Sequence, residues 1–532
     1  MRLLLLVALT LLGTTAHAQD PSLLGTLDFP TSASPEAQAA FEAGMLAAHS
    51  FWWDEARDHF RRAQQIDPAF AMAYWGEALT HHWPGPLEGD PAAGDAEGRA
   101  VLARLDALPH IRWTDRERAY VNALRFLYAE GSDPVANRAA HAEAMVRLAE
   151  QYRADPEAAI LAARARMSAG YVRPDVALDG PAFVVPIAAD LEEAFDRNPD
   201  HPGVAHYLIH LYDTPAFAPM GLRAARVYAE IAPASSHALH MPSHIFRALG
   251  MWDEVAASNV AAYEASVAWQ ERTGRPVTSR DVHALDWLVD AHVQRGRFSE
   301  ARQVADELRV LEEAAAAEGQ PLGFVPMTRD MVENRLFEAS RRAGLDVEPR
   351  PLPDGFDLRS VPPGPHIIDL GMRAAYAGQD SLALGVVAML GQFSQIPAVG
   401  PFRPVLVSAS HAIDAIRLRA AGDLDAALAE AAQSAEAIGD DPLGVERGRF
   451  RSVYASLLME SGAAAAARGV YAALVDRYPR VAEFEMGLAR AADAVGDGES
   501  AAGHYRTVLD LWAGADEGLP ALGEAREFVE AR

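Results

Sequence analysis

The segment GMLAAHSFWWDEARDHFRRAQQIDP, residues 44–68, decides the fold. Gly44, Ala56, Phe60, Ala63 and Pro68 fit positions 8, 20, 24, 27 and 32 of one 34-residue frame. Small residues at such intervals let two helices cross closely, and a proline ends the second helix. The segment therefore predicts an antiparallel pair of helices.

The same frame recurs along the chain. A turn glycine at position 15 is followed five residues later by a small or apolar residue in the pairs Gly250 and Val255, Gly296 and Ala301, Gly422 and Ala427, Gly462 and Ala467, and Gly496 and Ala501. This is the pattern of the tetratricopeptide repeat (TPR). Apolar and polar residues do not alternate with period two over any long stretch, so the sequence does not predict a β-sheet. We predict an all-α fold, a TPR-type solenoid of helical hairpins wound into a right-handed superhelix.

The chain divides into four predicted parts. Residues 1–18 have a basic start, an apolar run and small residues before Ala18, which is typical of a signal peptide cleaved after Ala18. An N-terminal lobe, 19–347, precedes a proline-rich linker, 348–365, and a C-terminal lobe, 366–532. A single continuous superhelix is the alternative. Residues 172–186 are typical of an inserted loop.

Composition limits the partners and the chemistry. The formal charge of −27 becomes −28 when residues 1–18, which hold the single charge of Arg2, are removed. Such a surface repels nucleic acid and anionic lipid, so we expect neither nucleic-acid binding nor stable membrane insertion. The chain has no cysteine and no lysine, which excludes disulfides, thiolate metal sites and Schiff-base chemistry. We expect a periplasmic or secreted protein.

Histidines are concentrated in one window of the chain. Eight of the 18 lie between His201 and His292, in the strings HYLIHLYD, HALHMPSHIF and HALDWLVDAH. The glycine and proline frame places their polar side chains at positions 2, 5 and 9 of three consecutive first helices, with Asp213 at position 12. These positions form one helical stripe, which in TPR arrays lines the concave face.

Converging imidazoles and carboxylates are ligands for a divalent transition metal, here zinc, iron, copper or manganese. The first predicted ligands are His206, His210, His240, His244 and Asp286. A second set, which either orients those ligands or binds a second ion, comprises His237, His283, Asp213 and Asp290. We expect Pro242 to delay or kink the helix that carries three of these histidines.

The chain resembles a group of exported bacterial TPR proteins of unassigned function. The resemblance lies in FWWDEARDHFRRAQQIDPAFAMAYWGEAL (51–79), in the HxxxHxxD segment HYLIHLYD and in HALHMPSHIFRALGMWDE (237–254). It implies a helical repeat array and brings no established reaction.

Three functions follow from these observations. The first is an exported binding or scaffold protein with a metal-loaded concave face that receives a protein or peptide partner. The second is a metal-dependent enzyme of hydrolase or oxygenase type, in which an aspartate serves as base. The third is a metal-free scaffold for protein interactions, which is the usual role of TPR arrays.

Overall fold

A computed structural model describes residues 21–82, 91–131, 133–173, 176, 178, 180–361, 364–396, 402–439 and 448–532. The predicted signal peptide lies outside these residues. Within them the chain is helical, and the sole β pairing is an isolated bridge between Phe70 and Arg112. No helix there is both long and apolar enough to cross a membrane.

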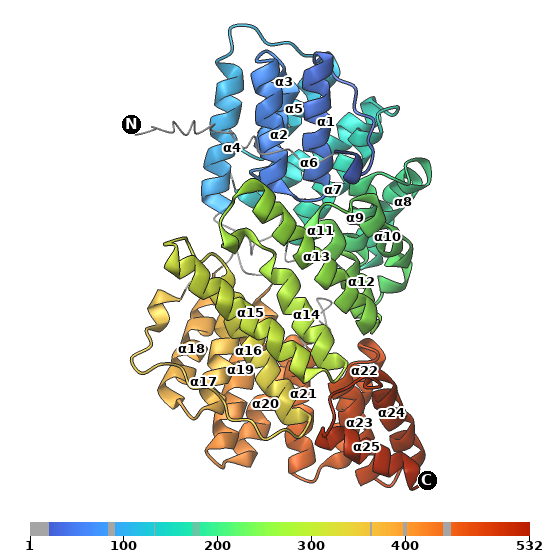
Figure 1. Ribbon diagram of the computed structural model, residues 1–532, viewed down its shortest axis with the longest axis vertical. Coiled ribbons are helices and arrows are strands. Elements are labelled where there is room, and N and C mark those ends of the chain that lie inside the picture. The colour runs from blue at the N-terminus through green and yellow to red at the C-terminus, as the bar shows by residue number, and fades with distance from the viewer. Residues whose placement is uncertain are drawn as a thin grey trace, which may run out of the picture.

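The helices follow one another along a curved path, with α1 to α8 at one end of the molecule and α17 to α25 at the other (Figure 1). They are α1 Pro35–His49, α2 Trp53–Ile66, α3 Ala71–Leu79, α4 Pro91–Asp106, α5 Asp115–Arg125, α6 Pro134–Gln151, α7 Pro156–Tyr171, α8 Pro181–Arg197, α9 Pro202–Tyr212, α10 Ala218–Ile231, α11 Ser236–His240, α12 Pro242–Ala248, α13 Trp252–Thr273, α14 Val282–Gln294, α15 Phe298–Ala317, α16 Val325–Arg342, α17 His366–Tyr376, α18 Asp380–Phe393, α19 Arg403–Ala420, α20 Leu424–Ile438, α21 Gly448–Glu460, α22 Ala464–Arg477, α23 Ala482–Ala494, α24 Gly498–Leu511 and α25 Pro520–Glu530. Short 3-10 turns are η1 Pro21–Leu23, η2 Val277–Ser279 and η3 Leu358–Ser360.

The five predicted turn glycines have the left-handed backbone that the repeat requires, with φ between 68° and 88°. Each lies just beyond the end of a helix, and the amide after it donates to a carbonyl five residues back, as Arg297 donates to His292 at 2.8 Å. Glycine adopts this conformation without the steric cost that a Cβ adds. The chain is therefore an all-α solenoid of TPR-type hairpins, as predicted.

Small residues let the first hairpin close. A Cβ on Gly44 would lie 2.7 Å from the ring of Phe60, which is itself fully buried. Phe60 thus fills the space that Gly44 leaves between α1 and α2. The repeat frame assigns these two residues to positions 8 and 24, and their contact explains why that pairing of a small with a large residue recurs.

The histidine-bearing helices are three consecutive first helices of hairpins: α9, the pair α11 and α12, and α14. Polar side chains cap their starts, because His201, Ser235 and Asp281 each accept a hydrogen bond from a backbone amide of the first turn. Pro242 interrupts the second of these helices, as expected, so that α11 ends at His240 and α12 begins at Pro242.

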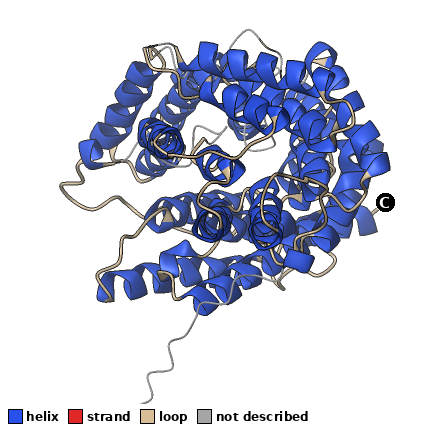
Figure 2. Cartoon of the chain, turned by 90° about the horizontal axis from the view of Figure 1, so that it is seen from above, coloured by secondary structure: helices blue, strands red, loops and turns tan. Residues whose placement is uncertain are grey.

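The last helices fold back onto the middle of the chain, where α22 to α25 lie below α12 and α14 (Figure 1). The indole nitrogen of Trp252 donates to the carbonyl of Arg480 at 2.6 Å, and that of Trp512 donates to the carbonyl of Gln294 at 3.1 Å. One continuous apolar core includes residues of α14 and α16 together with residues of α22 to α25. Seen from above, the outer helices curve around inner ones (Figure 2).

The structure describes parts of two segments that the sequence predicts to be irregular. Residues 348–361 form no α-helix and contain a turn at 354–355 and the turn η3, and α16 packs directly on α17 across them. The predicted loop 172–186 is wrong in its second half, because α8 begins at Pro181 and contains Pro186. Pro186 removes one amide donor from the interior of α8, and the buried face of Val184, Ile187 and Leu191 stabilises the helix despite this loss.

Candidate metal site

Six histidines of the three helices lie in two adjacent groups. We call His206, His210 and His237 the first cluster and His240, His244 and His283 the second cluster. In each cluster one ring nitrogen from every residue lies within 4.8 Å of the others. The rings of His210 and His244 are 6.3 Å apart between centroids, so the clusters are neighbours.

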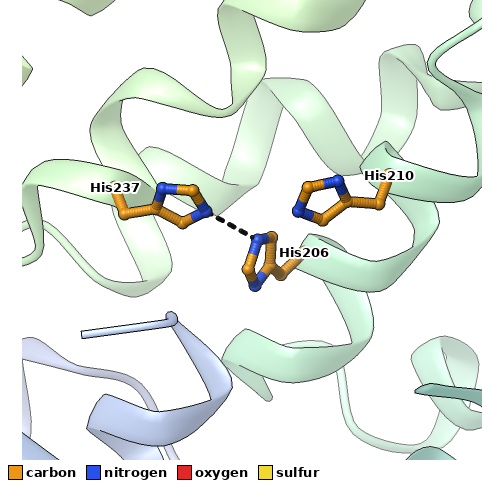
Figure 3. Close-up of side chains that lie close together, drawn as sticks. All are labelled: His206, His210 and His237. Carbon is orange, nitrogen blue, oxygen red and sulfur yellow. Dashed lines mark hydrogen bonds between the residues drawn. The ribbon is translucent and has the colours of Figure 1, made fainter. Parts of the chain in front are cut away.

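The first cluster joins α9 to α11, and its three rings point toward one another (Figure 3). The Nε2 atoms of His206 and His237 are 3.0 Å apart. Because Nδ1 of His206 contacts the carbonyl oxygen of His49 at 2.6 Å, that nitrogen must carry the ring hydrogen, and Nε2 of His206 presents a lone pair. Nε2 of His210 is buried without a hydrogen-bond partner among the described residues.

The second cluster has a stricter arrangement of hydrogens. Nδ1 of His240 contacts Oδ1 of Asn259 at 2.7 Å, and the Asn259 amide is oriented by its donation to the carbonyl of Val255 at 2.7 Å. Nδ1 of His244 contacts Oδ2 of Asp213, also at 2.7 Å. Both Nδ1 atoms therefore donate, and in the neutral form of the rings the two Nε2 atoms, 3.1 Å apart, face each other as lone pairs.

A third group, His49, Glu157 and His201, has similar spacing but different hydrogen bonding. The Glu157 carboxylate accepts from Nε2 of His49 at 2.9 Å and from Nε2 of His201 at 2.7 Å. The opposite nitrogens accept in turn, from the hydroxyl of Tyr207 at 2.9 Å and from the amide of Val204 at 3.3 Å. Every ring nitrogen is matched, so this group needs no ion to be satisfied.

Burial controls the protonation of these groups. Loss of solvent lowers the pKa of His206, His237 and His240 well below the usual value, and the neighbouring histidines lower it further. Burial, followed by His244, lowers the pKa of His210 to about 3. The rings are therefore neutral at physiological pH, which is the form that binds metals.

Burial opposes ionisation of Asp213, but the adjacent His244 outweighs it and lowers the pKa of that carboxyl. Asp213 is thus an ionised partner behind the ring of His244. A carboxylate in this position fixes the ring orientation and increases the basicity of a metal-bound imidazole.

The separation of the facing nitrogens suits a shared ion. Two imidazole nitrogens bound tetrahedrally to one zinc ion are about 3.3 Å apart, given metal–nitrogen bonds of about 2.0–2.1 Å. The Nε2 atoms of His206 and His237, 3.0 Å apart, and those of His240 and His244, 3.1 Å apart, are close to that separation. Asn259 and Asp213 accept the outer hydrogens of His240 and His244, and the carbonyl of His49 accepts that of His206.

The predicted histidines all lie in the two clusters, but their grouping differs from the prediction. The first predicted set draws two histidines from each cluster, because sequence spacing did not show that His237 turns toward α9. Asp213 contacts His244 from outside the cluster. Asp290 pairs with Arg247 at 2.9 Å.

The prediction of Asp286 as a ligand needs correction. Its carboxylate oxygen Oδ1 lies 2.6 Å from Nη1 of Arg335, and it belongs to neither cluster. Position 5 of α14 faces α16 rather than α12, since Arg335 comes from α16. The acid therefore neutralises a half-buried arginine instead of joining the rings.

Several residues that build the site were not predicted from the sequence. Phe51 has a positive φ of 51° and packs its ring 4.3 Å from that of His206, while Trp287 packs 4.4 Å from His244. His49 and Asn259 orient the rings. Asn259 lies on α13, a second helix outside the stripe, and His49 is 157 residues from its partner, so no local periodicity identifies them.

Comparisons with known proteins identify no family for this chain. No family model and no curated protein matches the chain. A human IFIT1 dimer solved with m7Gppp-AAAA is 12% identical, with 93% of this chain and 94% of that chain covered and a TM-score of 0.37. Yeast Tom70 is 11% identical, with 93% and 95% covered and a TM-score of 0.33. At these values we infer nothing about function from either.

Proposed function

We propose that this chain is an exported TPR-type binding or scaffold protein whose interior holds transition-metal ions between consecutive first helices. One ion is bound by the second cluster, and a second ion is bound by the first. The six imidazole ligands come from α9, α11, α12 and α14, so bound metal would also fix these helices to one another.

One observation carries the proposal: the Nε2 atoms of His240 and His244 face each other at 3.1 Å while both Nδ1 hydrogens are already donated. Two bare lone pairs at this distance repel unless a cation lies between them. The unpartnered Nε2 of His210 supports an ion in the first cluster as well. Imidazole ligands favour zinc, copper or iron over manganese.

Export and partner binding stay predictions from the sequence. The pattern of residues 1–18 supports export, and a TPR-type solenoid supports a protein or peptide partner. The metal site is independent of both.

Metal analysis of the purified chain tests the proposal. We would measure bound transition metals by mass spectrometry in the wild type, His237→Ala, His244→Ala and the control His411→Ala, whose half-buried ring bonds Glu430 at 2.7 Å away from the clusters. We expect one ion per cluster in the wild type and control. We expect His244→Ala to lose the ion of the second cluster and His237→Ala that of the first.

The outcomes separate the alternatives. Absence of metal, both as purified and after addition of zinc, copper or iron salts, would leave a metal-free scaffold. Metal retained in full by His244→Ala would also contradict the proposal. Loss restricted to His244→Ala, with His237→Ala unchanged, would limit the site to the second cluster.

A metal-dependent enzyme is a second candidate because each cluster supplies three protein ligands. A zinc ion with three protein ligands keeps a fourth position for water or substrate, whereas structural sites are closed by four. Hydrolysis of an activated ester by the metal-loaded protein, lost in His244→Ala and kept in His411→Ala, would favour this candidate.

A further inference from the structure

The C-terminal half of the solenoid encloses a cavity of about 550 Å³ that the metal clusters do not use. Residues of α14, α16, α17, α19, α21 and α23, the inner helices of this half, line it. Tyr471 of α22, residues of α23 and Trp512, which follows α24, complete the lining on the side of the C-terminal helices. Its volume is in the range of pockets for small molecules.

The charge of the cavity wall is opposite to that of the protein. The chain has 47 basic and 74 acidic side chains, whereas the wall has seven arginines and four acids. The seven arginines are Arg247, Arg335, Arg341, Arg342, Arg419, Arg449 and Arg490. An acidic chain that gathers seven arginines around one cavity offers guanidinium donors to an anion there.

Three acidic residues outside the cavity lining form ion pairs with arginines of the wall. Asp286 pairs with Arg335 at 2.6 Å and Asp369 with Arg449 at 2.8 Å, while Glu524 accepts from Nε and Nη2 of Arg490 at 2.9 Å and 2.6 Å. These pairs reduce the net charge but fix each guanidinium in place. Nη1 of Arg490 takes no part in its pair, and a guanidinium has more donors than one carboxylate can use.

Arg341 is the arginine best placed for a ligand. Its side chain is exposed, its guanidinium carbon lies 5.0 Å from the ring centre of Tyr376, and no ion pair joins it to an acid within the described residues. Arg419, another arginine of the wall, donates from Nε and Nη2 to the carboxylate of Glu460, and its Nη1 takes no part in this pair. Planar guanidiniums with unused donors recognise carboxylate and phosphate oxygens in pairs.

We infer that this cavity binds a small anion that carries carboxylate or phosphate groups. The arginines supply donors in fixed positions, and the rings of Tyr376 and Tyr471 give the wall apolar surface for the body of the ligand. The site is distinct from the metal clusters, although Trp287 contacts both regions: Arg247 lies 4.6 Å over its ring, and His244 lies on it.

Calorimetric titration of the full chain at low salt tests this inference. The probes are pyrophosphate and succinate, which distinguish a phosphate from a carboxylate ligand. We expect one of them to bind saturably with one site per chain. Arg341→Gln and Arg419→Gln should each weaken binding about tenfold, since each removes charge-assisted hydrogen bonds. Arg309→Gln, an exposed arginine paired with Glu333 on the outer side, should bind as the wild type does.

Both probes also bind metals, so the titration is repeated in the His237→Ala/His244→Ala background. Unchanged affinity there assigns binding to the cavity. The inference is overturned if neither probe binds saturably at millimolar concentration, if Arg341→Gln and Arg419→Gln bind like the wild type, or if binding disappears with the histidines. Circular dichroism of each variant establishes that the fold is retained.

Discussion

The Nε2 atoms of His240 and His244 lie 3.1 Å apart, four residues and one helix break from each other, and both rings donate their Nδ1 hydrogens away from this contact. Asn259 and Asp213 take the hydrogens on the other side. The nearby group around Glu157 has the same elements but matched donors and acceptors. Hydrogen bonding, and not histidine density, therefore distinguishes a cluster that needs a cation from one that does not.

Asp213→Asn should weaken metal binding while leaving the ligands in place. The amide oxygen can still accept from Nδ1 of His244, but the negative charge that increases ring basicity is lost. We expect affinity at the second cluster to fall by about tenfold to a hundredfold, measured by competition with a chelator. Asp196→Asn, which alters an exposed pair with Arg223, is the control and should bind metal normally. Equal affinities of the two variants would rule out the proposed role of Asp213.

Glu157→Gln should destabilise the fold without changing metal content. A glutamine has one acceptor oxygen, so its amide group would face a ring hydrogen that Glu157 now accepts. A buried donor left unpaired costs about 3 kcal/mol at most. Urea unfolding should show this loss, and metal analysis should match the wild type. Glu430→Gln, at the half-buried partner of His411, should cost far less. Loss of metal in Glu157→Gln would show that the third group also binds an ion.

Two turn glycines at the same repeat position should respond differently to alanine. Gly462 has φ 82°, and no atom lies within 4 Å of the position that a Cβ would take, so Gly462→Ala should cost about 1–2 kcal/mol from backbone strain alone. At Gly296, φ is 70° and a Cβ would also lie 2.6 Å from that of Ala515. Gly296→Ala should therefore lose about 1–3 kcal/mol more through overpacking. Thermal unfolding of both variants measures the difference, and equal losses would mean that the contact of α14 with the C-terminal helices does not form in solution.

His141 should make the protein sensitive to acid. Burial lowers the pKa of this ring to about 4, although Nδ1 donates to the carbonyl of Ala123 at 2.9 Å. Between about pH 6.5 and 4 the unfolded chain takes up a proton that the folded chain does not, so stability falls with falling pH by up to about 1.4 kcal/mol per pH unit. His141→Asn keeps a donor for that carbonyl but does not titrate. Urea unfolding at about pH 7.5 and pH 5 should show a smaller loss in this variant, whereas parallel losses would contradict the shift.

Much of the site followed from the repeat frame. Because a glycine with positive φ follows the ends of α12 and α14, Gly250 and Gly296 fix the register of the helices before them, and that register puts their histidines on one stripe. Local backbone chemistry, repeated at a constant spacing, was enough to predict the hairpins and the helices that carry the rings.

The sequence by itself determined the helical repeat, its register and the stripe of imidazoles, because these depend on residues a few positions apart. Only the tertiary structure decided which rings share an ion site, that Asp286 turns to Arg335, and that residues of α22 and α23 complete the lining of an arginine-rich cavity. Those outcomes depend on the angles at which successive hairpins pack and on side chains such as His49 and Asn259, whose partners lie on other helices. Contacts between distant helices produce no regular spacing of residues in the sequence, so a single sequence does not predict them.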